Sequence, residues 1–147
     1  MYKRILIPLD GSKLAESALA HAESLALKYN AELILLQVVR PLAITAREPA
    51  EIMMFQENME HLRADAKAYL NGLKGEFREK KIRVEIYVGL GPVVAEIVET
   101  AATHSVDLVI IASHGRSGLG RVFFGSVASG VLNRIERPLM VIRSAET

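Results

Sequence analysis

The stretch DLVIIASHGRSGLGRVFFGSV, residues 107–127, decides the fold of this chain. Residues 108–112 form a continuous apolar run with several β-branched side chains, which predicts a strand buried on both faces. The glycine-rich segment after it indicates a loop, and the apolar spacing after Gly125-Ser126 predicts a helix. Glycines let backbone amides turn inward, and the first turn of a helix adds unpaired N–H groups and partial positive charge. The stretch therefore predicts an anion site.

Two common phosphate-binding loops do not fit these residues. Gly120 and Gly125 have the glycine spacing of a P-loop, but Ser126 stands where that motif requires lysine. Gly118-x-Gly120 begins a dinucleotide fingerprint, whose third glycine is replaced by Phe123. What remains is a strand, a glycine loop and a helix start, for which the plain alternative is a surface connection whose glycines only make turns.

Composition bounds the class of protein. At 147 residues the chain fits one domain, which we expect to span residues 1–147. Lys and Arg number 18 against 17 Asp and Glu, so a net charge of +1 implies no nucleic-acid partner. The absence of cysteine excludes disulfides and thiol catalysis. No apolar run reaches membrane-spanning length and the first one is too short for a signal peptide, so we expect a cytoplasmic protein without membrane contact.

Strands and helices alternate along the chain. Apolar runs predict strands at 4–8, 31–39, 82–88, 108–112 and 138–143, with Pro8 ending the first because it cannot donate to a ladder. Helical spacing predicts a helix after the cap Ser12 with His21 on its inward face, and a long helix from about residue 52 that could break at Gly72 or Gly75. Residues 41–49 read as a loop, and two further helices follow Gly91-Pro92 and Gly125-Ser126.

This alternation predicts an α/β fold with a parallel sheet covered on both faces. Residues 82–88 alternate strictly between apolar and polar side chains, which is typical of an edge strand. Strand order 3-2-1-4-5 satisfies that requirement and the right-handed crossover rule. In this order the ligand crevice lies at the carboxyl ends of strands one and four. Asp10 and the loop from Ala112 to Gly125 meet there, although a hundred residues separate them in sequence.

The chain resembles the universal stress protein family over its whole length. The resemblance rests on the opening KRILIPLDGS, on SHGRSGLGRVFFGSV and on the closing RPLMVIR. The nucleotide loop of that family reads G-x2-G-x9-G-[S/T], and Ala112-x2-Gly115-x9-Gly125-Ser126 matches it at every position but the first. The resemblance implies a Rossmann-like fold, binding of ATP (or ADP or AMP), and a role in stress response.

The resemblance also implies where the nucleotide binds. The end of the first strand, Pro8, Leu9 and Asp10, would hold adenine and ribose, with Val38 as an apolar wall. The ribose and phosphates would be held by the loop and the residues around it: Ile111, Ala112, Gly115, Gly125, Ser126 and Val127. The departure from the family is Ala112, whose methyl group could crowd a close ligand.

Several of these residues have a second interpretation. Asp10 could accept from ribose hydroxyls or help hold Mg²⁺, or it could only cap the turn Asp10-Gly11-Ser12. Ser126 could bind phosphate and cap its helix at the same time. Arg116 could neutralise phosphate charge or remain a solvated loop arginine. The pair Ser113-His114 does not indicate a hydrolase, because no nucleophile elbow is present.

The favoured hypothesis is an adenine-nucleotide-binding stress protein that acts as a sensor or switch. No catalytic lysine or carboxylate pair is evident, so any ATP hydrolysis should be slow and no catalytic residue is assigned. The alternative is a nucleotide-free member that acts through dimerisation and protein contacts. In either case the last strand, from Leu139 to Arg143, is an apolar edge, which predicts a homodimer formed through that strand.

Overall fold

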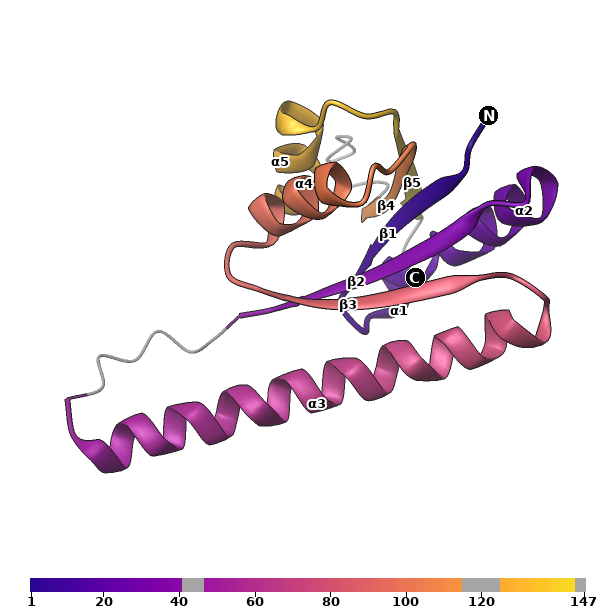
Figure 1. Cartoon of the computed structure of the whole chain (residues 1–147). Coiled ribbons are helices and arrows are strands. Elements are labelled where there is room, and N and C mark those ends of the chain that lie inside the picture. Colours follow the sequence, from indigo (N-terminus) through magenta and orange to yellow (C-terminus); the bar gives the residue numbers. More distant parts are fainter. Residues whose placement is uncertain (41–46, 115–124, 145–147) are drawn as a thin grey trace.

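The computed structural model describes residues 1–40, 47–114 and 125–144. Five parallel strands form one sheet in the order β3-β2-β1-β4-β5 (Figure 1). The strands are β1 (Arg4–Leu9), β2 (Glu32–Val39), β3 (Val84–Leu90), β4 (Leu108–His114) and β5 (Leu139–Ser144). The helices are α1 (Lys13–Glu16), α2 (Leu19–Tyr29), α3 (Pro49–Glu79), α4 (Val93–Thr103) and α5 (Ser126–Arg134). The predicted fold class and strand order are confirmed, with β3 at one edge of the sheet.

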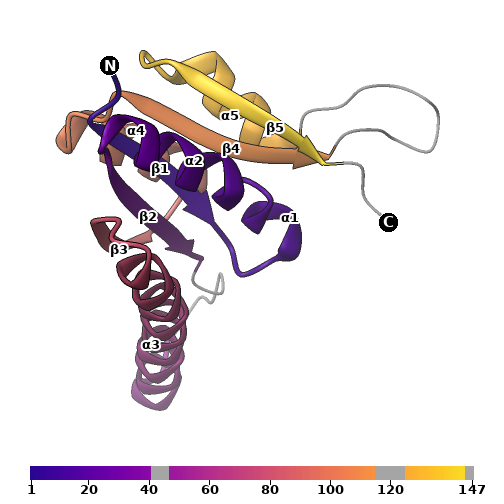
Figure 2. The ribbon, with the colours of Figure 1, turned by 90° about the vertical axis from the view of Figure 1, so that its right-hand side faces the viewer.

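Helices cover both faces of the sheet in two layers (Figure 2). Because successive strand residues point to opposite faces, Ile5 and Ile7 of β1 pack with α2 and α3, whereas Leu6 packs with α4 and α5. All three side chains are fully buried. Burial of one such side chain stabilises the fold by about 1.5–3 kcal/mol, so the two apolar layers are what hold the sheet together.

Strand β1 is hydrogen-bonded to the β4 side of the sheet only in its first half. The backbone N–H groups of Lys3 and Arg4 donate to Asp107 Oδ2 at 2.8 and 2.9 Å. The β1–β4 ladder then ends at Leu6. The sequence predicts that Pro8 ends β1, and this is wrong, because the strand continues to Leu9. Pro8 is tolerated since its nitrogen lies on the β4 side, where pairing has already stopped.

The predicted helix after Ser12 is split into α1 and α2. Ser12 caps α1 as expected, with Ala15 N–H donating to Ser12 Oγ at 3.1 Å. Ala22 and Ala26 of α2 are buried, as is its N-cap residue Ala18, whereas His21 lies to one side of them and is exposed, so its predicted place in the core is wrong. Asn30 ends α2 in the left-handed conformation (φ 52°), which asparagine adopts more readily than most other residues.

Helix α3 runs unbroken for 31 residues. The predicted break at Gly72 or Gly75 does not occur, because the buried Leu70 and Phe77 hold the helix to the core on either side of the two exposed glycines. The helix also begins earlier than predicted, at Pro49, which suits the first helical position since the missing N–H would have no intrahelical acceptor. The remainder of the predicted loop, residues 41–46, lies outside the described residues.

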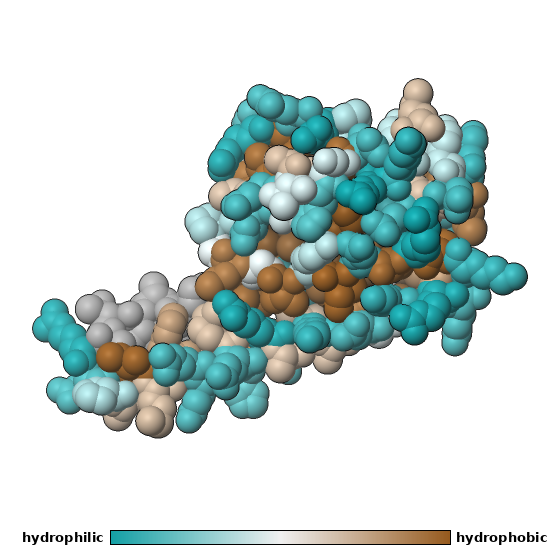
Figure 3. Space-filling view, in the orientation of Figure 1, coloured by the Kyte–Doolittle hydropathy of each residue, from teal (hydrophilic) through white to brown (hydrophobic). Residues whose placement is uncertain are grey.

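The start of α3 projects beyond the sheet (Figures 1 and 3). Met53 and Met54 are 61% and 69% exposed there, and packing against the body begins around Phe55 and Met59, which contact Val39 of β2. Apolar side chains also show on the surface over the β3 edge of the sheet (Figure 3). No helix within the described ranges combines the length and apolar character needed to cross a membrane.

Candidate functional site

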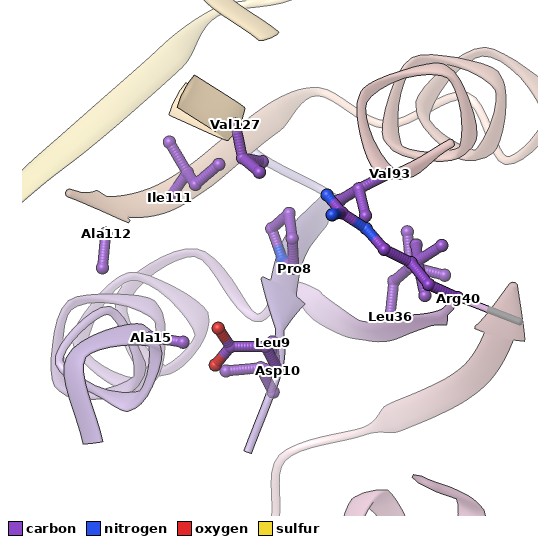
Figure 4. A pocket seen from close by; sticks show the side chains of 11 residues that line it. Pro8, Leu9, Asp10, Ala15, Leu36, Arg40, Val93, Ile111, Ala112 and Val127 are labelled. Carbon is purple, nitrogen blue, oxygen red and sulfur yellow. The ribbon is translucent and has the colours of Figure 1, made fainter. Parts of the chain in front are cut away.

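A cavity of about 430 Å³ opens where the carboxyl ends of β1, β2 and β4 meet the starts of α4 and α5 (Figure 4). This is the place that the strand order predicts for a ligand, because neighbouring strands there lead to opposite faces of the sheet. The cavity is formed by mostly apolar side chains from all five of these elements and from α1: Pro8, Leu9, Asp10, Ala15, Leu36, Val38, Arg40, Val93, Ile111, Ala112 and Val127.

Most of the sequence-predicted site residues come together in this cavity. Those that line it are Pro8, Leu9, Asp10, Val38, Ile111, Ala112 and Val127. Gly125 and Ser126 directly precede Val127 and form the start of α5. Gly115 and Arg116 lie outside the described residues. The common position of the seven lining residues agrees with the sequence prediction, and their role in binding stays a prediction.

Four lining residues are missing from the sequence prediction. Three of them, Ala15, Leu36 and Val93, add apolar wall. The fourth is Arg40, an exposed residue directly after β2 whose guanidinium reaches across the cavity toward Val93 (Figure 4). Its position one residue beyond a strand end at the predicted crevice is a signal that sequence analysis could have used, by the same reasoning that selected Asp10.

Asp10 has the turn-capping role that was one of its two interpretations. Its Oδ1 accepts the N–H of Ser12 at 2.9 Å, and Gly11 between them has a φ of 85°, which favours glycine. The carboxylate lies at the edge of the cavity, on the side of α1 and Ala15 (Figure 4). Since one carboxylate oxygen is enough for the cap, the other can accept a bond from a ligand hydroxyl.

The start of α5 brings backbone N–H groups to the cavity. The first-turn amides of a helix have no intrahelical acceptor, and Gly125, the N-cap residue, has no side chain to accept from them. Val127, in this first turn, lines the cavity. Gly125 has a φ of −58°, which any residue can adopt, so a left-handed backbone is not the reason for glycine here. An anionic group would be stabilised by these amides and by the helix dipole.

Helix α1 is tied to α3 by a partly buried hydrogen bond. The hydroxyl of Tyr69 on α3 donates to Glu16 Oε2 at the end of α1. Burial and this hydrogen bond to a carboxylate raise the pKa of Tyr69 above its ordinary value, because both disfavour the phenolate. The bond fixes α1, whose Ala15 lines the cavity, against the longest helix of the fold.

The lining of the cavity suits a ligand with an apolar part and an anionic part. Asp10 and Arg40 are the charged side chains among its described lining residues, and they belong to adjacent strand ends. Apolar side chains provide a surface for a flat ring, and the amides of α5 provide an anion site. Among the described residues, no three His, Asp or Glu side chains gather into a metal site.

Comparison with known proteins places this architecture in a family. Residues 1–143 match the sequence profile described as the universal stress protein family. A curated relative, universal stress protein MJ0577 of Methanocaldococcus jannaschii, is 29% identical, and the alignment covers 97% of this chain and 96% of that protein. The solved structure of hypothetical protein MJ0577 superposes with a TM-score of 0.85 at 30% identity, covering 100% of this chain and 99% of the other.

Two further solved structures have the same fold. Universal stress protein UspA from Lactobacillus plantarum gives a TM-score of 0.81 at 26% identity, over 97% of this chain and 98% of the other. The universal stress protein from Archaeoglobus fulgidus in complex with dAMP gives a TM-score of 0.67 at 19% identity, over 97% and 98%. The profile match over nearly the whole length, together with these neighbours, shows that this chain belongs to the universal stress protein family.

Proposed function

We propose that this protein binds an adenine nucleotide, ATP or its products ADP or AMP, and acts as a sensor or switch in stress response. The observation that carries the proposal is the convergence of Asp10, Val38, Ala112 and Val127 in one cavity beside the start of α5. A volume of about 430 Å³ is within the range of small-molecule sites. The complex of the Archaeoglobus fulgidus relative with dAMP supports the choice of an adenine nucleotide.

The proposed orientation follows from the chemistry of the lining. Adenine and ribose lie on Pro8, Leu9 and Val38, and Asp10 accepts from a ribose hydroxyl. The phosphates lie at the start of α5, where the first-turn amides and the hydroxyl of Ser126 can donate to them. Sequence analysis adds two residues outside the described ranges to this end of the site, Gly115 and Arg116.

We also propose that hydrolysis, where it occurs, is slow. Asp10 is the one carboxylate among the described lining residues, and no lysine lines the cavity there. Fast phosphoryl transfer needs a positioned nucleophile and several charge-stabilising groups. Mg²⁺ is commonly held by one or two carboxylates together with substrate phosphates, so Asp10 is the residue that would hold it, and the ion would neutralise phosphate charge.

Ala112 keeps a second function open. It lines the cavity at the position where the family motif has glycine, and its methyl group takes space beside the ligand. A member whose cavity cannot admit a nucleotide would act instead through dimerisation and contacts with other proteins. The two functions differ in whether adenine nucleotide is bound at all.

Two measurements test the proposal. Purified protein is denatured and extracted, and mass spectrometry of the extract is expected to detect ATP, ADP or AMP. Isothermal calorimetry of nucleotide-free protein is then expected to show saturable ATP binding, with equal or higher affinity in Ala112→Gly if the methyl group crowds the ligand. If the extract contains no nucleotide and neither protein binds ATP, ADP or AMP, the nucleotide-free alternative is correct.

A further inference from the structure

Ser113 is the one polar residue buried among the described part of the chain, with 2% of its surface exposed. It follows the apolar residues of β4, and a hydroxyl in such a place costs free energy unless it is hydrogen-bonded. Its Oγ accepts the backbone N–H of Gly125 at 2.8 Å, across twelve residues of sequence. One hydrogen bond therefore joins the end of β4 to the N-cap of α5.

Two hydrogen bonds hold Gly125, the N-cap residue of α5. The N–H of Gly125 donates to Ser113, and its C=O accepts the N–H of Ser129 at 2.9 Å, the first bond of the helix. Gly125 has no side chain with which to hold its own position. The hydroxyl of Ser113 is therefore one of the contacts that fix the start of α5, together with the buried Ala128 and Val131.

We propose that Ser113 is a positioning residue for the nucleotide phosphates, and this inference rests on the proposed function. Ser113 is absent from the cavity lining, so it acts on the ligand through Gly125 and the start of α5. Preorganised donors bind an anion better than donors that must first be ordered, because the ordering cost has already been met in folding. The N–H of Gly125 is already used by Ser113 and is not a phosphate donor. That role falls to the amides after it.

The test compares Ser113→Ala with two matched variants. Ser113→Thr keeps the hydroxyl, and Ser129→Ala removes a serine from the same helix that does not line the cavity. Calorimetry with ATP, ADP and adenosine is expected to show about a tenfold loss of ATP affinity in Ser113→Ala, since the hydrogen bond that orders the start of α5 is lost. Adenosine affinity should change less than twofold. Ser113→Thr should restore ATP binding, and Ser129→Ala should match the parent.

A second measurement needs no variant. Amide exchange of the nucleotide-free parent, followed residue by residue by NMR, is expected to show slow exchange at Gly125, with ATP then adding protection at Ser126 and Val127. Fast exchange at Gly125 without nucleotide would overturn the inference. So would a Ser113→Ala protein that binds ATP within twofold of the parent, or one that loses adenosine as strongly as ATP, because a loss of both indicates a general structural role.

The outcomes separate this inference from the proposed function. If the parent binds ATP and Ser113→Ala binds it equally well, the nucleotide site stands and the positioning role is wrong. If the parent binds no adenine nucleotide, both are wrong. If Ser113→Ala does not fold, the exchange rate of Gly125 in the parent decides.

Discussion

Gly130 of α5 packs so closely on Val94 of α4 that a Cβ added at Gly130 would lie 2.7 Å from Val94 Cγ2. A valine methyl group next to its own backbone cannot move aside cheaply. We therefore expect Gly130→Ala to lower the free energy of unfolding by about 1–3 kcal/mol through overpacking, although alanine favours helix. Urea denaturation measures the change, and adding Val94→Ala should recover most of the loss.

Gly72→Ala is the matched control for that substitution. Gly72 also lies inside a helix, α3, but a Cβ there would meet nothing within 4 Å. It should raise the free energy of unfolding by about 0.5–1 kcal/mol, from helix propensity alone. If Gly130→Ala and Gly72→Ala changed the free energy of unfolding equally, α4 and α5 would have to move apart without cost. That result would contradict the close contact of Gly130 with Val94.

Arg40 supplies the positive side chain among the described residues of the cavity. Removing its charge by Arg40→Gln should weaken ATP binding about three- to tenfold at low salt and leave adenosine binding nearly unchanged, because only ATP carries the opposing charge. The difference should shrink as salt screens an exposed guanidinium. Arg63→Gln, on the exposed side of α3, is the control. Equal losses for ATP and adenosine would place Arg40 against the base instead.

Sequence patterns predicted the sheet well because the order of apolar and polar residues within a strand indicates how many of its faces are buried. The alternation around Tyr87 placed β3 at an edge, and the apolar run of β4 placed that strand inside. The errors concern features that depend on contacts between distant segments. His21 is exposed because α2 meets the sheet with the side that carries Ala22 and Ala26, and Pro8 lies within β1 because the β1–β4 ladder has already ended. The spacing of apolar residues along one helix or strand shows neither which side of α2 meets the sheet nor where the β1–β4 pairing ends.

The candidate site shows the same division. Asp10 and Val127 follow predicted strand and helix boundaries, so topology alone brought them together. Ser113 was visible in the sequence only as a neighbour of His114. Its bond to Gly125 depends on which face of β4 it occupies and on where α5 begins, to within one residue. A sequence pattern does not place the start of a helix to within one residue, so this contact could not be predicted from the sequence.

Alkaline pH should destabilise the fold through two tyrosines. A hydrogen bond to Glu85 and burial raise the pKa of Tyr87 from 10.0 to about 12, and burial and Glu16 raise that of Tyr69. A pKa that is higher in the folded state stabilises the fold below the unfolded value near 10, and that stability is lost as pH rises through the folded value. The free energy of unfolding should therefore fall between pH 10 and 12. In Tyr69→Phe, the free energy of unfolding, measured by urea denaturation, should fall less steeply with pH over this range. A pH dependence identical to that of the parent would contradict the role of Tyr69.

Strand β5 is the edge strand of the sheet opposite β3, and its apolar residues from Leu139 to Ile142 are partly buried within the described part of the chain. An edge of this kind usually pairs with another strand. We predict a two-fold homodimer in which two copies of β5 lie antiparallel. Sedimentation at micromolar concentration should give twice the chain mass of 16.2 kDa.

The ladder identifies a substitution that removes this dimer with little damage to the fold. Val109 N–H donates to Pro138 C=O, and in a parallel ladder alternate residues face the neighbour, so the backbone groups of Val141 point away from β4. Val141→Pro should therefore remove an outward donor and halve the mass, with the circular dichroism of the fold retained. Met140→Pro, whose nitrogen faces β4, should instead unfold the edge. A parent of single-chain mass, or a folded Val141→Pro protein that stays dimeric, would show that β5 is not the contact.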